Sequence, residues 1–80
     1  MHYVYLFESV AAPGRRYVGV TTDLKRRLQD HDAGKSPHTS KFTPWCLLTY
    51  IAFSDQAKAR SFERYLKSGS GHAFANKRLW

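Results

Sequence analysis

The chain is 80 residues long, and its 13 Lys and Arg residues outnumber its six Asp and Glu residues, giving a formal net charge of +7. This length fits one compact domain spanning 1–80 and leaves no room for a second, so a catalytic site and its substrate surface must share one small body. The positive charge favours a polyanionic partner, either nucleic acid or an anionic membrane surface. The sequence shows no apolar run long enough to span a membrane and no secretory leader, which favours nucleic acid as the partner. The same two features favour a cytoplasmic location.

Two strands are expected at the start of the chain, over 3–7 and 16–20. Both segments are rich in aromatic and β-branched residues, which favour extended structure. Pro13-Gly14 between them has strong turn chemistry. These segments therefore predict a β-hairpin with a long loop.

A helix is expected next, over about 23–33. Thr22 is a suitable N-cap, Leu24 and Leu28 lie four residues apart on one face, and Gly34 can end the helix. The leucine stripe predicts that this helix packs on the sheet.

The apolar run that follows the next loop predicts a largely buried third strand, over about 46–53. It begins with Cys46, the only cysteine of the chain. A single cysteine excludes an internal disulfide and a zinc site built on paired thiolates, so Cys46 is interpreted as a small buried apolar residue.

Two helices are expected after this strand. The first spans about 55–67 with Ser54 as its cap, and the glycines at 69–71 end it; the second spans about 71–79. The order β-β-α-β-α-α predicts an α+β fold, in which a three-stranded sheet is flanked by helices.

Two strand tripeptides, Tyr3-Val4-Tyr5 and Tyr17-Val18-Gly19, resemble the paired motifs of the GIY-YIG nucleases, with Tyr3 where glycine is usual. Three further segments resemble the family's first helix, the loop after it and the helix with its acidic residue: TTDLKRRLQDH, GKSPHTSKFTPW and FERYLK. The chain is similar to the small free-standing bacterial members, and to the N-terminal nuclease domain of the excision-repair incision subunit. The resemblance implies a GIY-YIG-like fold.

Hydrolysis of a phosphodiester needs an activated water, neutralisation of phosphoryl charge and help for the departing alkoxide. By resemblance, Glu63 is catalytic and binds one divalent cation, Mg²⁺ or Mn²⁺, hard ions suited to carboxylate oxygen. The alternative for Glu63 is an exposed helix residue paired with Lys67 at i+4.

Arg27 and His31 are four residues apart and share one face of the first helix, which can project over the hairpin tyrosines. The resemblance implies that Arg27 holds the scissile phosphate and that His31 positions water or assists proton transfer. A solvated basic residue and a histidine complementing the helix dipole are the alternatives.

Tyr5 and Tyr17 match the two family tyrosines, and one of them is expected to act as general base, with a slight preference for Tyr5. A phenol with a pKa near 10 needs neighbouring cations for this role, such as Arg27, Lys25 and the metal. The alternative is that both rings are core aromatics. Gly19 is expected to leave room for the substrate to approach the backbone.

Further substrate contacts are expected from basic and polar residues outside this constellation. By resemblance these include His38 in the loop after the first helix, and Asn76, 13 residues after Glu63; Lys25, Lys41 and Lys67 add charge near the site. The wider phosphate footprint comprises Lys35, Lys41, Lys58, Arg60, Lys67, Lys77 and Arg78.

These features predict a divalent-metal-dependent endonuclease that hydrolyses phosphodiester bonds in DNA. Without a sequence-reading domain, it is expected to select single-stranded, branched or nicked structures in repair or DNA processing. One alternative is a non-catalytic nucleic-acid-binding module with the same fold; another is a basic protein-interaction or ribosome-associated domain. The four histidines lack the H-E-x-x-H spacing of a zinc hydrolase.

Overall fold

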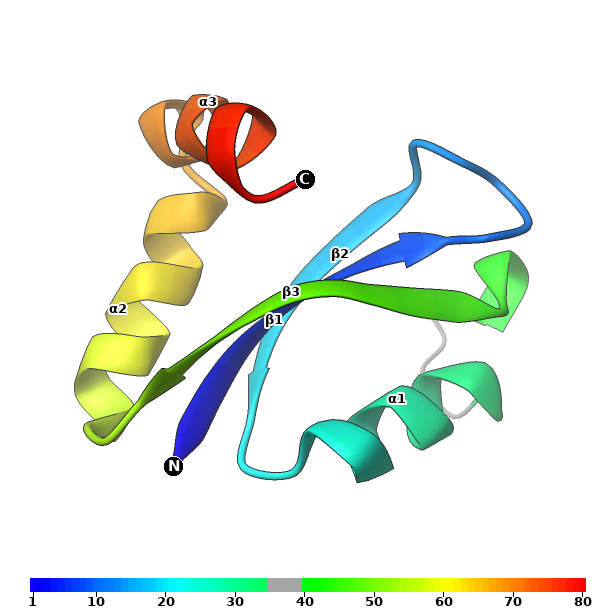
Figure 1. Cartoon of the computed structure of the whole chain (residues 1–80), viewed down its shortest axis with the longest axis horizontal. Helices are drawn as coiled ribbons and strands as arrows, with labels where there is room; N and C mark the ends of the chain where they lie inside the picture. Colours follow the sequence, from blue (N-terminus) through cyan, green and yellow to red (C-terminus); the bar gives the residue numbers. More distant parts are fainter. Residues whose placement is uncertain (35–39) are drawn as a thin grey trace.

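The structure, a computed structural model, describes residues 1–34 and 40–80 and contains a three-stranded antiparallel sheet in the order β2-β1-β3 (Figure 1). β1 (His2–Ser9) is the central strand, while β2 (Arg16–Thr21) and β3 (Trp45–Phe53) form the edges. The hairpin turn contains Gly14, whose φ of 94° suits glycine. The predicted α+β fold is confirmed.

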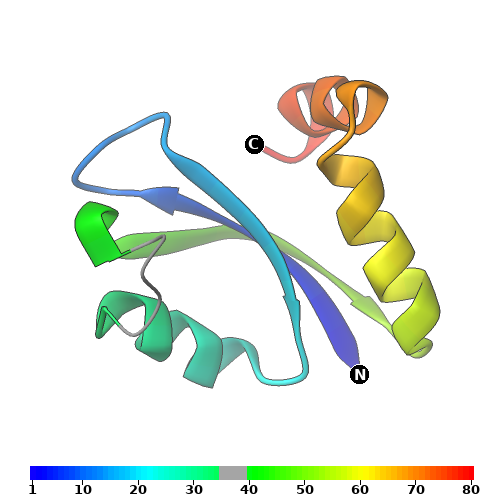
Figure 2. The same ribbon diagram turned by 180° about the vertical axis from the view of Figure 1, so that it is seen from behind.

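Both faces of the sheet are covered, because successive residues of β1 point to opposite faces. Val4 and Leu6 pack against one face of the helical pair α2 and α3, in a cluster that includes Ala59, Leu66 and Ala75. Tyr5 and Phe7, on the other face, pack with Leu24 and Leu28 of α1. This is why four consecutive residues of β1 are buried and why the sheet lies between two helical layers (Figures 1 and 2).

The helices are α1 (Leu24–Asp32), α2 (Gln56–Leu66) and α3 (Gly69–Arg78), with a 3₁₀ turn at Ser40–Phe42. Their bounds agree with the predicted ranges to within two residues. No helix in the ranges 1–34 and 40–80 is long and apolar enough to cross a bilayer.

The predicted N-caps Thr22 and Ser54 are each wrong by one residue. The side chain of Asp23 accepts a hydrogen bond from the Arg26 amide at the start of α1, and Asp55 does the same for the Ala57 amide of α2. A carboxylate caps as well as a hydroxyl does and also complements the positive end of the helix dipole.

The predicted break at 69–71 is also wrong, because these residues form the first turn of α3. Ser68 caps this helix by accepting from the Gly71 amide. A Cβ at Gly71 would overlap the backbone carbonyl of Tyr65. The glycine therefore lets α3 begin tightly against the end of α2.

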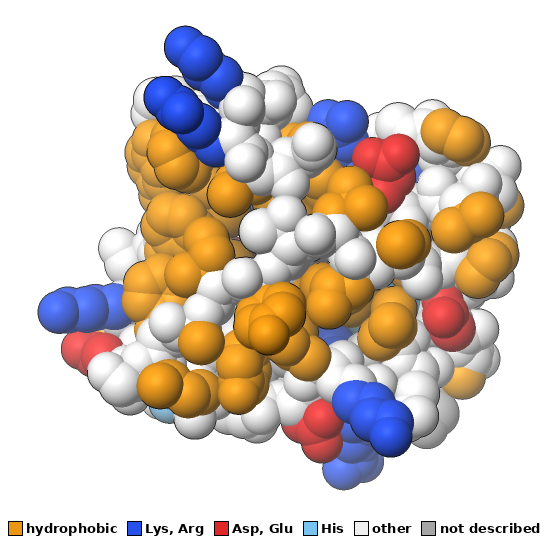
Figure 3. All heavy atoms as spheres, viewed as in Figure 1, with side chains coloured by type: hydrophobic (Ala, Val, Ile, Leu, Met, Phe, Trp, Pro, Cys, Tyr) orange, Lys and Arg blue, Asp and Glu red, His pale blue; other side chains and the backbone are white. Residues whose placement is uncertain are grey.

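The third strand is less buried than predicted. Cys46 is exposed, and Leu48 and Tyr50 are 45% and 52% exposed. The reason is that β3 is an edge strand, and a register irregularity opposite Leu6 and Phe7 interrupts its pairing with β1. Figure 3 shows hydrophobic side chains over the middle of the face that carries β3, with Lys and Arg toward its rim.

Candidate active site

Tyr5 reaches across β2 at Gly19, its partner in the sheet register. A Cβ at Gly19 would overlap the phenol oxygen and Cζ of Tyr5. The space that the sequence assigned to an approaching substrate is therefore filled by the tyrosine ring. Gly19 places the Tyr5 hydroxyl toward the β2 edge, which lies in front between α1 and α2 in Figure 2.

The Tyr5 hydroxyl contacts both predicted functional residues of α1. Arg27 Nε donates a hydrogen bond to the Tyr5 oxygen at 3.0 Å, and His31 Nε2 lies 3.4 Å from the same oxygen. Because an arginine Nε–H can only donate, the Tyr5 oxygen accepts this bond and its own hydrogen remains for His31. The i,i+4 spacing of Arg27 and His31 aims both side chains at one phenol.

Aromatic rings surround His31, which is 1% exposed. Its ring centroid lies 5.2 Å from that of Phe7 and 5.0 Å from that of Tyr17. Tyr5 and Tyr17 stack with centroids 6.2 Å apart. Phe7 was not among the predicted site residues, although its i+2 spacing from Tyr5 on one strand places it on the same face.

The electrostatics keep Tyr5 and His31 neutral near pH 7. Burial raises the pKa of Tyr5, and the hydrogen bond and positive charge of Arg27 oppose this without reversing it. Burial also lowers the pKa of His31, and the charge of Arg27 adds to the effect. Desolvation disfavours a charged form of either group, so only Arg27 carries charge in this chain of contacts.

The environments of the two tyrosines differ. Tyr5 is fully buried, while Tyr17 is half-buried and its ring lies 6.0 Å from the ammonium of Lys67. The slight preference for Tyr5 as general base gains no support from its burial or from its raised pKa. Tyr17 is better placed to meet water.

Glu63 lies on α2, on the other side of the sheet from α1. Its side chain is 21% exposed, and Oε2 lies 3.5 Å from Lys67 Nζ. The ion pair that the sequence offered as the alternative for Glu63 is therefore present. It also places a cation between the Glu63 carboxylate and the Tyr17 ring, so the two residues share one neighbourhood.

The metal prediction depends on Glu63 alone. Within the described ranges, no group of three His, Cys, Asp or Glu side chains could hold an ion. One accessible carboxylate still fits Mg²⁺, which keeps several waters and takes further oxygens from substrate phosphates. Lys67 fills the cation position beside Glu63 in this structure.

Asn76 lies apart from these contacts. Its Oδ1 accepts a hydrogen bond from Arg16 Nη1 at 3.1 Å, and Arg16 also pairs with Glu8 at 3.1 Å and stacks over the ring of Trp80. Arg16 was not predicted as part of the site. It links β1, β2 and α3 beside Tyr17.

The remaining predicted contacts are less well placed. Lys25 is exposed on α1 and Lys41 is exposed on the 3₁₀ turn, while His38 and Lys35 lie outside the described residues. A hollow of about 390 Å³ next to Arg27 is lined by the residues Thr21, Thr22, Asp23, Arg26, Arg27 and Asp30. Arg26, rather than Lys25, accompanies Arg27 there.

A small α+β domain with two tyrosines on paired strands, an arginine on the first helix and a glutamate on the second has the pattern of a compact nuclease. Residues 1–77 match the family described as the GIY-YIG catalytic domain. The chain belongs to this family, the GIY-YIG nuclease domain family.

Relatives carry the name UPF0213. The chain is 37% identical over 68 residues to a UPF0213 protein of Haloquadratum walsbyi, covering 84% of this chain and 74% of the relative. It is 36% identical over 69 residues to one of Lacticaseibacillus paracasei, covering 85% and 78%. The solution NMR structure of the UPF0213 protein BH0048 from Bacillus halodurans superposes with a TM-score of 0.57 at 30% identity, covering 98% of this chain and 85% of that one.

Proposed function

We propose that this chain is a divalent-metal-dependent endonuclease that hydrolyses phosphodiester bonds in DNA. The observation that carries the proposal is the buried contact chain Arg27–Tyr5–His31, which lies beside Tyr17 at the sheet edge that Lys67 and Glu63 approach from α2. An oriented guanidinium, a phenol next to water and a carboxylate are the groups that this reaction requires.

Arg27 binds the scissile phosphate in this proposal. Its Nε is fixed by Tyr5, and its side chain lines the open hollow beside the end of β2. A guanidinium held in one orientation can meet phosphoryl oxygens without reorganising as negative charge develops. Tyr5 then acts as a positioning residue for Arg27.

Tyr17 is the proposed general base. It is half-buried, and Lys67 and Arg27 place positive charge beside it, as a phenolate that accepts a proton requires. Neutral His31 packs against the Tyr17 ring and restricts its orientation. In this proposal the Tyr17 hydroxyl first loses its own proton to solvent. A water between Tyr17 and the phosphate would then give a proton to the Tyr17 phenolate oxygen as the water oxygen bonds to phosphorus and the bond from phosphorus to the leaving oxygen breaks.

Glu63 is the proposed ligand of one Mg²⁺ or Mn²⁺. Such an ion supplies charge neutralisation at the scissile phosphate and the leaving oxygen. Lys67 is hydrogen-bonded to Glu63, so a cation held by Glu63 would compete with the Lys67 ammonium for this carboxylate.

The substrate is proposed to be DNA with single-stranded, branched or nicked segments, processed or repaired in the cytoplasm. The support is the net charge of +7 and a site confined to one edge of a small sheet, which reaches backbone phosphates over few nucleotides.

The decisive experiment compares cleavage of single-stranded and branched DNA by the wild-type protein and by Glu63→Gln, with Mg²⁺, with Mn²⁺ and with EDTA. Arg64→Gln, one residue along the same helix and exposed, is the matched control. We expect cutting that needs metal, survives in Arg64→Gln and falls by about 10²-fold or more in Glu63→Gln. DNA binding without cutting in all three proteins would instead favour the non-catalytic module.

A further inference from the structure

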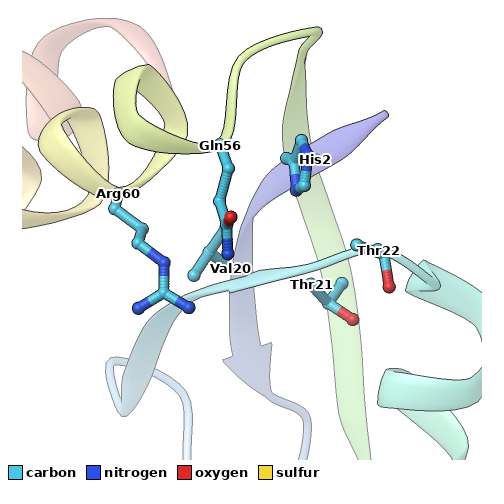
Figure 4. Close-up of a pocket in the computed structure, with 6 residues that line it drawn as sticks. All are labelled: His2, Val20, Thr21, Thr22, Gln56 and Arg60. Carbon is cyan, nitrogen blue, oxygen red and sulfur yellow. The ribbon is translucent and has the colours of Figure 1, made fainter.

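A second hollow, of about 250 Å³, lies where the end of β2 meets the start of β1 and α2. It is lined by the residues His2, Val20, Thr21, Thr22, Gln56 and Arg60. Figure 4 shows Arg60 and Gln56 extending from α2 toward β2, with His2 on β1 and the two threonines at the end of β2. None of these residues belongs to the candidate catalytic constellation.

The lining of this hollow has the chemistry of an anion site. It contains a guanidinium, a side-chain amide and two hydroxyls, and no carboxylate. Arg60 is exposed and forms no ion pair with any residue in 1–34 or 40–80. Arg, Gln and Thr are side chains that proteins use to hold nucleic-acid phosphates.

This hollow adjoins the one that contains Arg27. Thr21 and Thr22 line both, so a short segment of backbone separates the two. Thr21 Oγ1 accepts a hydrogen bond from the Asp23 amide at 3.1 Å, which fixes this segment at the start of α1. The hydroxyl of Thr22, which is exposed, makes no such bond in the described part of the chain.

We propose that the second hollow binds a non-scissile phosphodiester of the same nucleic-acid strand, with Arg60 as its principal charge. The inference rests on the proposed function, because it assumes that Arg27 holds the scissile phosphate. A strand that passes over Thr21 and Thr22 then presents one phosphate to each arginine. The site fixes the register and direction of the strand and recognises no base.

The first test measures binding without catalysis. Arg60→Gln and Arg64→Gln each remove one positive charge from an exposed position on α2, so they share any effect of net charge. With EDTA present, anisotropy of a labelled single-stranded oligonucleotide should show binding weakened at least threefold in Arg60→Gln relative to Arg64→Gln. The negative slope of log affinity against log salt should become shallower by about 0.7 in Arg60→Gln and should not change in Arg64→Gln. Equal losses in the two variants would overturn the proposal.

The second test locates the phosphate. Oligonucleotides with one uncharged methylphosphonate linkage at successive positions are cut by wild type and by Arg60→Gln. A methylphosphonate at one linkage other than the scissile one should raise the KM of wild type and leave its kcat unchanged. The same modification should change neither KM nor kcat of Arg60→Gln. An identical position profile for both proteins would overturn the proposal. If wild type cuts nothing, the proposed function fails, and the binding test still decides the Arg60 site independently.

Discussion

Tyr5 and Gly19 behave as one structural unit at the residue scale. They are paired across β1 and β2, and the ring of one fills the space that a side chain on the other would need. The contact aims the Tyr5 hydroxyl at Arg27. The tyrosine of one strand motif and the glycine of the other thus serve the same purpose, which is to orient an arginine.

Gly19→Ala should destabilise the fold by about 1–3 kcal/mol through overlap with the Tyr5 ring. Chemical denaturation measures this cost. In a Tyr5→Leu background the overlap is absent, so the same substitution should cost less, and the two changes should be non-additive. Full additivity would show that the Gly19 requirement has another cause.

His31 should make stability depend on pH. Its pKa is lowered in the folded state, mainly by burial, while the unfolded chain binds the proton near pH 6.5. Above that pH the side chain is neutral in both states and stability is at its full value. As the pH falls through 6.5 the unfolded state takes the proton first, so the free energy of unfolding decreases until the folded pKa is passed.

His31→Phe tests this dependence because it keeps an aromatic ring between Phe7 and Tyr17. The free energy of unfolding of wild type should decrease from pH 7 to pH 5, and that of His31→Phe should decrease less. His72→Phe, at an exposed position on α3, is the control and should retain the wild-type slope. Equal slopes for all three proteins would contradict the argument.

Local spacing explains which site residues could be predicted. Arg27 and His31 are one helical turn apart, so their common face follows from sequence alone, and the structure brings both to Tyr5. Arg16 could not be predicted, because its contacts with Glu8 and Asn76 depend on strand register and on the docking of α3. The catalytic roles themselves remain predictions.

At the scale of secondary-structure elements, the close packing of α3 against the end of α2 requires glycine at position 71 but not at position 69. A Cβ at Gly71 would overlap the backbone of Tyr65, whereas nothing lies within 4 Å of a Cβ at Gly69. Both glycines lie in the first turn of α3. A sequence pattern of closely spaced glycines suggests a break, and only the packing shows that one of them permits close contact.

Gly71→Ala should destabilise the protein by about 1–3 kcal/mol by pushing α3 away from α2. Gly69→Ala should be neutral or stabilising, by up to about 1 kcal/mol, because alanine restricts the unfolded chain. Thermal unfolding of the two variants, with hydrogen exchange of the α3 amides, separates these outcomes. Similar unfolding temperatures for both would argue against a close-contact role.

The element order was predictable because each segment has its own periodicity and end signals, and these agree with the observed bounds. The degree of burial of β3 could not be predicted, because an apolar run fits both a central strand and an edge strand. Only the strand order β2-β1-β3 places that segment at an edge, with Cys46 exposed.

At the scale of the whole molecule, the candidate site draws on both helical layers. Arg27 and His31 come from the layer on one face, and Lys67 and Arg60 come from α2 on the other. They meet at β2, where Tyr17 packs against His31 of α1 and lies near Lys67; Figure 2 shows β2 in front, between α1 and α2. A cationic surface around a strand edge suits a nucleic-acid backbone that bends over this edge.

This arrangement predicts how binding depends on salt. If Arg27, Lys67 and Arg60 each contact a phosphate, log affinity for single-stranded DNA should fall with log salt with a slope of about −2, at about 0.7 per contact. The slope is measured by anisotropy between low and moderate salt, with EDTA present to prevent cutting. An Arg27→Gln, Arg60→Gln double variant should retain a slope of only about −0.7, because Lys67 remains. A wild-type slope near zero would mean that the +7 charge acts on something other than a phosphate backbone, and the nucleic-acid assignment would then fail together with the roles of these three cations.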